Sequence, residues 1–79
     1  MSKENPTFGE MACGVNFNPG GHAAVEEIKR RFADICDDLN DRRNATDNPN
    51  VARMLSIAIT EAQTAQMWAV KAVTWGYRV

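Results

Sequence analysis

Residues 49–75 are apolar on more than one side when they are read as a helix. One stripe steps by three and four residues and consists mostly of alanine: Leu55, Ala58, Ala62, Ala65, Ala69 and Ala72. A second stripe lies on a neighbouring face and contains Met54, Trp68 and Trp75. Because a helix that is apolar on several sides is buried on several sides, this segment needs more than one packing partner.

The first packing partner is a second predicted helix over about residues 18–43. Its narrow apolar stripe has the same spacing and consists of Val25, Ile28, Phe32, Ile35 and Leu39, with Cys36 beside it. The connection over residues 44–48 is short and polar. Short connections join antiparallel neighbours, so the two segments should form a helical hairpin.

Both predicted helices begin with the same signal. Asn18-Pro19 precedes the first helix and Asn48-Pro49 the second. Asparagine caps a helix, and proline suits its first position. Gly20 and Gly21 weaken the first turn of the first helix, which favours a start nearer to His22.

The remaining residues, 1–17, contain Pro6, Gly9 and Gly14 and show no sustained period. They predict an irregular arm with one short helical turn around residues 8–12. The fold class is therefore all-α, a single domain over residues 1–79 built as an antiparallel two-helix hairpin with a short irregular N-terminal arm.

A lone hairpin of 79 residues would be marginally stable without further support. Two cysteines, Cys13 and Cys36, and one histidine exclude the common closed zinc sites. Without a signal peptide or a long apolar run, we expect a cytosolic chain with reduced thiols and no membrane contact. Assembly into a homo-oligomer is the support that remains.

Composition also limits the function. Nine Lys and Arg residues oppose ten Asp and Glu residues, for a net charge of −1, so the chain does not resemble a protein that coats DNA or RNA. No catalytic set, phosphate loop or metal-ligand spacing is visible, which predicts a protein that is not an enzyme and uses no cofactor or metal.

Lys29, Arg53 and Lys71 each lack an acidic neighbour four residues away on their helix. Arg30, Arg31 and Arg42 each have such a neighbour, which explains them structurally. Lys71 lies between two tryptophans, so the alternative is a lysine that reaches solvent along their rings with a cation–π contact. For Lys29 the alternative is an exposed surface lysine. The residues alone favour these alternatives.

The loop over residues 17–22 is a further candidate, because the start of a helix presents free N–H groups that bind anions. Phe17, Asn18 and Gly21 would line such a site. The alternative is a plain helix entry in which Phe17 packs on the hairpin.

Two segments in the chain resemble a known family in order and spacing. The first is Phe17-Asn18-Pro19-Gly20-Gly21 followed by Val25 and Ile28-Lys29, and the second is Met67-Trp68-Ala69-Val70-Lys71-Ala72. They resemble the phage-encoded anti-CBASS cyclic-oligonucleotide sponges, whose hairpin is shared with some sponges that oppose Thoeris defence. The likeness covers roughly residues 17–74, although Gly20 stands where relatives are expected to carry serine.

The resemblance implies an oligomer, often a hexamer, that sequesters cyclic dinucleotides and cyclic trinucleotides in the cytoplasm of the infected bacterium. Such ligands require cations for their phosphates and flat or apolar surfaces for their bases. The predicted ligand-binding residues are Phe17, Asn18, Gly21, Lys29, Arg53, Lys71, Thr74 and Arg78.

Within this set, Lys29 is expected to meet a phosphate of a cyclic dinucleotide from an exposed position. Lys71, Thr74 and Arg78 step by three and four residues, so they share one face. In an assembly with threefold symmetry they would form a ring that matches a cyclic trinucleotide. The alternative function is a structural or protein-interaction oligomer that binds no nucleotide.

Overall fold

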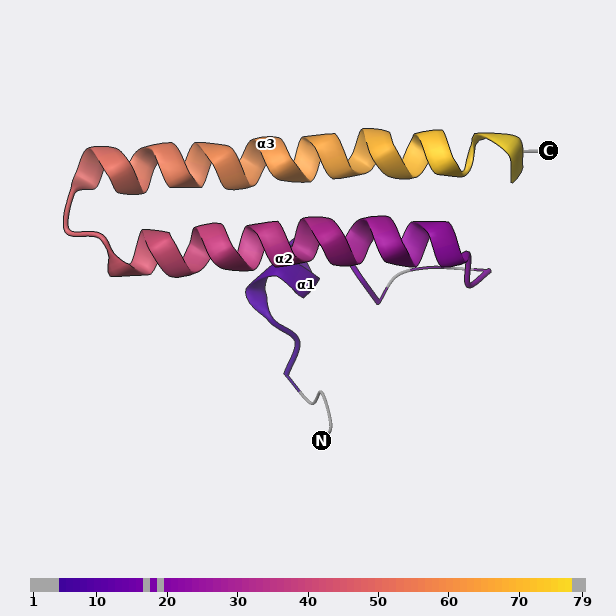
Figure 1. The fold of residues 1–79 in the computed structure, drawn as a ribbon, viewed down its shortest axis with the longest axis horizontal. Coiled ribbons are helices and arrows are strands. Elements are labelled where there is room, and N and C mark those ends of the chain that lie inside the picture. The colour runs from indigo at the N-terminus through magenta and orange to yellow at the C-terminus, as the bar shows by residue number, and fades with distance from the viewer. Residues whose placement is uncertain (1–4, 17, 19, 78–79) are drawn as a thin grey trace.

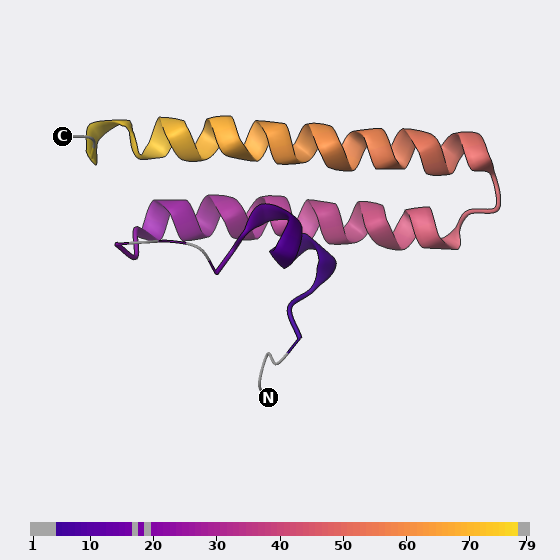
Figure 2. The ribbon, with the colours of Figure 1, turned by 180° about the vertical axis from the view of Figure 1, so that it is seen from behind.

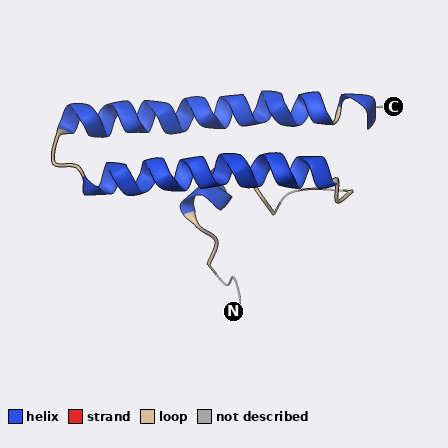
Figure 3. Ribbon diagram, in the orientation of Figure 1, coloured by secondary structure: helices blue, strands red, loops and turns tan. Residues whose placement is uncertain are grey.

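The computed structural model describes residues 5–16, 18 and 20–77, and this part of the chain contains helices and no strand (Figure 3). The helices are α1 (Phe8–Cys13), α2 (Ala23–Ala45) and α3 (Pro49–Val73), followed by a 3-10 turn, η1 (Trp75–Tyr77). Helices α2 and α3 lie side by side and antiparallel (Figure 1). The predicted all-helical hairpin is therefore confirmed.

The turn between α2 and α3 follows the predicted chemistry. The side chain of Asn48 accepts hydrogen bonds from the N–H groups of Asn50 and Val51 at 2.9 and 3.3 Å, and Pro49 occupies the first turn. These bonds satisfy N–H groups that a helix start leaves unpaired. Helix α3 ends at Val73 rather than at residue 75, because the chain tightens into η1.

The first long helix begins next to His22, as the glycine pair predicted, and not at residue 18. Gly20 and Gly21 adopt left-handed conformations with φ of 90° and 61°, so α2 begins at Ala23, after His22. Asn18 does not cap the helix. Its amide instead closes a turn, since it donates to the His22 carbonyl at 3.0 Å and accepts from the His22 N–H at 3.3 Å.

The arm has more structure than a single helical turn. Thr7 and Glu10 cap α1 reciprocally, because each side chain accepts a hydrogen bond from the other's backbone N–H. The helix ends at Gly14, which is left-handed with φ of 61°. Seen from behind, α1 lies across α2 (Figure 2).

Two long-range hydrogen bonds fix this position. The Gly9 N–H donates to Asp37 of α2 at 2.6 Å, and the Gln63 amide of α3 donates to the Ala12 carbonyl at 3.1 Å. The arm is thereby attached to both long helices.

The core is small and includes both cysteines. It is formed by Cys13, Val15, Ala33, Cys36 and Ile59, with Phe8, Phe32, Leu39 and Ala62 packed around it. Burial raises the pKa of the Cys13 thiol to about 12, and the neighbouring Cys36 thiol adds to this shift. Burial also raises the pKa of Cys36. Both thiols therefore stay protonated near neutral pH, and Cys13 is explained as a core residue.

Much of the apolar surface remains uncovered in a single chain. The Cα atoms extend over 48 × 31 × 12 Å, so the hairpin is about one helix thick. The exposed large apolar side chains are Met11, Ile35, Met54, Ile57, Met67, Trp68 and Trp75. The expected position of Ile35 in the packed stripe is wrong, since it is 49% exposed. No helix in the described ranges could cross a membrane.

Gly9 offers a direct test of how the arm is held. A Cβ added there would overlap the backbone carbonyl of Ala33, which cannot move aside as a side chain could. We expect Gly9→Ala to destabilise the protein by about 1–3 kcal/mol, the usual cost of overpacking. This exceeds the gain of roughly 1 kcal/mol that alanine brings to a helix. A thermal scan measures the change.

The matched control is Gly76→Ala, because an added Cβ at Gly76 meets no atom within 4 Å. Equal melting temperatures for the two variants would contradict the packing of α1 on α2.

Candidate functional site

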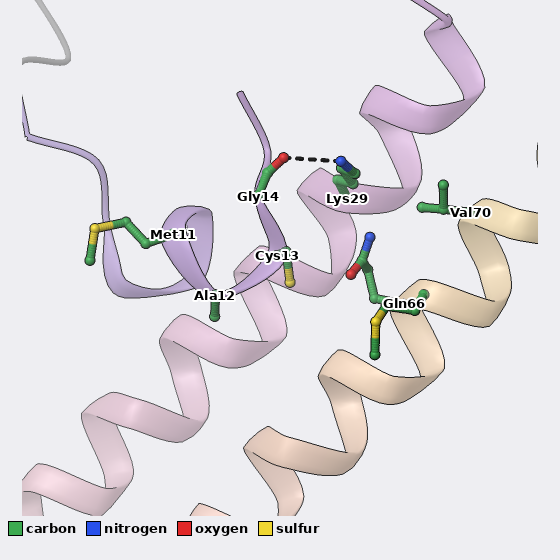
Figure 4. A pocket seen from close by; sticks show the side chains of 8 residues that line it. Met11, Ala12, Cys13, Gly14, Lys29, Gln66 and Val70 are labelled. Atoms are coloured by element: carbon green, nitrogen blue, oxygen red, sulfur yellow. Dashed lines mark hydrogen bonds between the residues drawn. The ribbon is translucent and has the colours of Figure 1, made fainter. Parts of the chain in front are cut away.

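The arm, α2 and α3 line an open pocket of about 470 Å³ (Figure 4). The wall that the arm contributes consists of Met11, Ala12, Cys13 and Gly14. Lys29 lines it from α2, and Gln66, Met67 and Val70 line it from α3. The pocket is largely apolar, and Lys29 and Gln66 are its polar side chains. Its volume falls in the range of small-molecule sites.

Lys29 is buried in this pocket. Only 7% of the residue is exposed, so the expectation of an exposed position is wrong. Its ammonium donates a hydrogen bond to the Gly14 carbonyl at 3.1 Å (Figure 4). A lysine is rarely buried unless its charge is paired or used. Lys29 is buried because the arm packs over α2. The spacing of residues within α2 gives no information about that contact.

Gln66 is a site residue that sequence reasoning missed. It is 5% exposed, and no hydrogen bond between described residues engages its side-chain amide. In Figure 4 the amide points into the pocket, toward the side on which Lys29 lies. A signal did exist, because Gln66 interrupts an apolar stripe made of Ile59, Ala62, Val70 and Val73. The amide atoms are open to the pocket, because none of the described side chains buries a nitrogen or oxygen atom without a hydrogen-bond partner.

A second, smaller pocket of about 270 Å³ lies beside the first. It is lined by Thr64, Met67, Trp68 and Lys71, and Met67 belongs to both pockets. The Lys71 ammonium lies 5.3 Å from the ring centre of Trp68 and 6.0 Å from that of Trp75. The cation–π contact that the sequence raised as an alternative is therefore present in the single chain.

The other predicted residues are distributed along the hairpin. The Thr74 hydroxyl donates to the Val70 carbonyl at 2.8 Å, so its oxygen is left as an acceptor. Arg53 is exposed near the start of α3, about 27 Å along the helix from Lys71. Arg53 and Lys71 of one chain therefore cannot share a small ligand. Phe17 and Arg78 lie outside the described residues.

The loop before α2 satisfies its own polar groups. The Gly21 N–H donates to the Asn18 carbonyl at 2.9 Å, and the His22 N–H is bound to the Asn18 side chain. These donors are therefore not open to an anion in the single chain. The loop lies at the same end of the hairpin as the last turns of α3 (Figure 1).

The helical ion pairs follow the sequence closely. Arg31 binds Glu27 at 2.9 Å and Arg42 binds Asp38 at 3.0 Å, as the four-residue spacing predicts. Arg30 pairs with Glu26 at 3.8 Å, but its second partner is Glu10 of the arm rather than Asp34. These arginines therefore form ion pairs at the surface and with the arm, whereas Lys29 is the cation that lines the first pocket.

The described part of the chain contains no group of three His, Cys, Asp or Glu side chains placed to hold a metal ion. Residues 12–74 match the family model described as Acb2/Tad1, hairpin domain. Comparisons with curated proteins and with solved structures gave no match. The matched residues include both long helices and, apart from Met11, the residues that line the first pocket.

Proposed function

Since the chain belongs to the Acb2/Tad1 hairpin family of anti-CBASS and anti-Thoeris sponge proteins, we propose that it sequesters cyclic di- and trinucleotide second messengers without cleaving them. In an infected bacterium, capture of these messengers would keep CBASS effectors inactive. The protein would act in the cytoplasm, by stoichiometric binding rather than turnover.

The observation that carries this proposal is the buried ammonium of Lys29 in a mostly apolar pocket. An ammonium in a site of low dielectric binds a phosphate more strongly than one in water does. Methionine and valine side chains around it suit the faces of nucleobases, because Met adapts to flat ligands. The positive charge of this ammonium would be neutralised by a phosphate of the ligand, in addition to the hydrogen bond that it donates to Gly14.

A second class of ligand, the cyclic trinucleotides, is assigned in this proposal to Lys71 and Thr74. Both lie near the exposed surface formed by Trp68 of α3 and Trp75 of η1. Copies related by threefold symmetry, as in a hexamer, would bring three such lysines to three phosphates. The Thr74 oxygen would then accept a hydrogen bond from the ligand, because its hydroxyl already donates to the Val70 carbonyl.

The exposed aromatic face also favours an alternative, a helical oligomer that binds another protein and no nucleotide. Large exposed apolar patches mark interaction surfaces of either kind. The two functions differ in whether a cyclic nucleotide is retained.

A release experiment separates them. The protein is incubated with cyclic dinucleotides and trinucleotides, freed of unbound ligand, heat-denatured, and the released material is analysed by chromatography. Intact ligand in stoichiometric amount is expected. Cleaved ligand would indicate an enzyme, and the absence of retained ligand would support the structural alternative.

The trinucleotide site has its own test, the double variant Lys71→Ala, Thr74→Ala. We expect it to lose cyclic trinucleotide binding by about tenfold or more, since each lost charge-assisted contact is worth roughly 1.5–3 kcal/mol. Binding of cyclic dinucleotides should stay unchanged, because Lys29 is untouched. Calorimetry with both ligands measures this, and an equal loss of both would refute a separate second site.

A further inference from the structure

Gln66 is the one side chain of the first pocket that is polar, uncharged and almost fully buried. It is 5% exposed, and among the described residues its amide has no hydrogen-bond partner. None of the described side chains has a buried nitrogen or oxygen atom that lacks a hydrogen-bond partner, so the Gln66 amide reaches water in the empty pocket. A ligand that displaces this water must supply one donor and one acceptor in its place.

Gln63 provides the contrast one turn earlier on α3. Its amide donates to the Ala12 carbonyl at 3.1 Å and so holds the arm. The two glutamines therefore have different roles. The amide of Gln63 is bonded within the chain, and the amide of Gln66 points into the pocket (Figure 4).

A carboxamide offers one donor and one acceptor side by side. Adenine presents the complementary pair, the N6 amino group and the N7 or N1 nitrogen, and glutamine pairs with it through two hydrogen bonds. Guanine carries more polar groups, namely O6, N7, N1–H and the N2 amino group. In a pocket whose other walls include Met11, Met67 and Val70, those additional groups would be buried without partners.

We propose that Gln66 is a specificity-determining residue that reads the edge of an adenine base in the first pocket, while Lys29 holds the adjoining phosphate. This inference rests on the proposed function and adds to it a base preference, adenine over guanine. The role is that of a ligand contact. It differs from the roles of Lys29, which neutralises charge, and of Gln63, which positions the arm.

The test compares affinities for cyclic di-AMP and cyclic di-GMP by calorimetry, with the ratio of the two dissociation constants as the readout. The wild-type protein should prefer cyclic di-AMP. Gln66→Met keeps the length of the side chain but removes both hydrogen-bonding groups. It should weaken cyclic di-AMP binding about tenfold or more and cyclic di-GMP binding less, so the ratio falls.

Gln66→Glu should invert the preference. A carboxylate accepts from N1–H and N2–H of guanine together, but it offers adenine no donor. Gln63→Met is the matched control, and we expect it to lower both affinities in proportion while the ratio stays at the wild-type value.

The proposal is overturned if Gln66→Met leaves the ratio unchanged, or if Gln63→Met shifts it equally. It is also overturned if the wild-type protein binds both ligands with equal affinity. Failure of the wild-type protein to bind either ligand would instead sink the proposed function, and this inference with it.

Discussion

Replacement of Lys29 by methionine is expected to lower the affinity for cyclic dinucleotides about 100-fold or more. The Lys29 residue is 7% exposed, so the contact of its ammonium with a phosphate would be largely shielded from water. A charge-assisted hydrogen bond is worth roughly 1.5–3 kcal/mol, and 2.7 kcal/mol corresponds to about a factor of 100. Isothermal calorimetry with a cyclic dinucleotide measures the loss directly.

Methionine is the informative substitution at this position, because it keeps an apolar stem in the pocket. A glutamate would set a carboxylate against the Gly14 carbonyl that Lys29 now contacts, so the loss of ligand and the loss of the arm would be confounded. Lys71→Met serves as the control for removing a cation elsewhere. Unchanged affinity in Lys29→Met, with the melting temperature also unchanged, would refute the role of Lys29.

Truncation of Trp68 to alanine is expected to disrupt self-assembly while a single chain keeps its fold. Trp68 is 66% exposed in the single chain, so its packing against another helix, which the sequence predicts, would have to occur between chains. Loss of a large aromatic side chain from a packed site costs about 3–5 kcal/mol. Tryptophans are also the commonest energetic centres of interfaces.

Light scattering coupled to size exclusion measures this effect as a fall in mass. Trp68→Phe is the matched control, since it retains most of the apolar area and should keep the native mass. An alanine variant with the native mass and the native melting temperature at every concentration would rule out Trp68 as an interface residue.

The hairpin itself could be predicted because its signals are local. Asn48 and Pro49 start α3, and the spacing of apolar residues sets the length of both long helices. Gly20 and Gly21 weaken the first helical turn, as their type predicts, and their left-handed backbone moves the start of α2 to Ala23. Local propensity and capping determine such features, so one sequence is enough to read them.

The packing of the arm could not be predicted in the same way. It depends on contacts between distant residues, such as the bond from Gly9 to Asp37 and that from Gln63 to Ala12. Contacts of this kind leave no helical or strand period in the sequence. The sequence consequently predicted Lys29 to be exposed, and it offered no explanation for Cys13.

The burial of Gln66 could be predicted only in part. The alanine stripe drew attention to one face of α3, yet Ala65 and Ala72 are exposed and the most buried residues are Ile59 and Gln66. The buried face of α3 is therefore centred on Ile59 and Gln66 and not on the alanine stripe, because the arm packs on part of α3 as well as on α2. A polar residue within an apolar stripe was the available clue, and it becomes informative once the third packing element is known.

The way in which the arm is attached has a thermodynamic consequence for any ligand in the first pocket. One wall of that pocket is a short segment held on the hairpin by hydrogen bonds from Gln63 and Lys29 and by its own bond to Asp37. A short segment at the edge of a fold can open locally at lower free energy than the whole fold does. A ligand that touches the wall binds only the closed form, so occupancy and closure are linked reciprocally. The pocket should therefore release its ligand through opening of the arm, with the two long helices left intact.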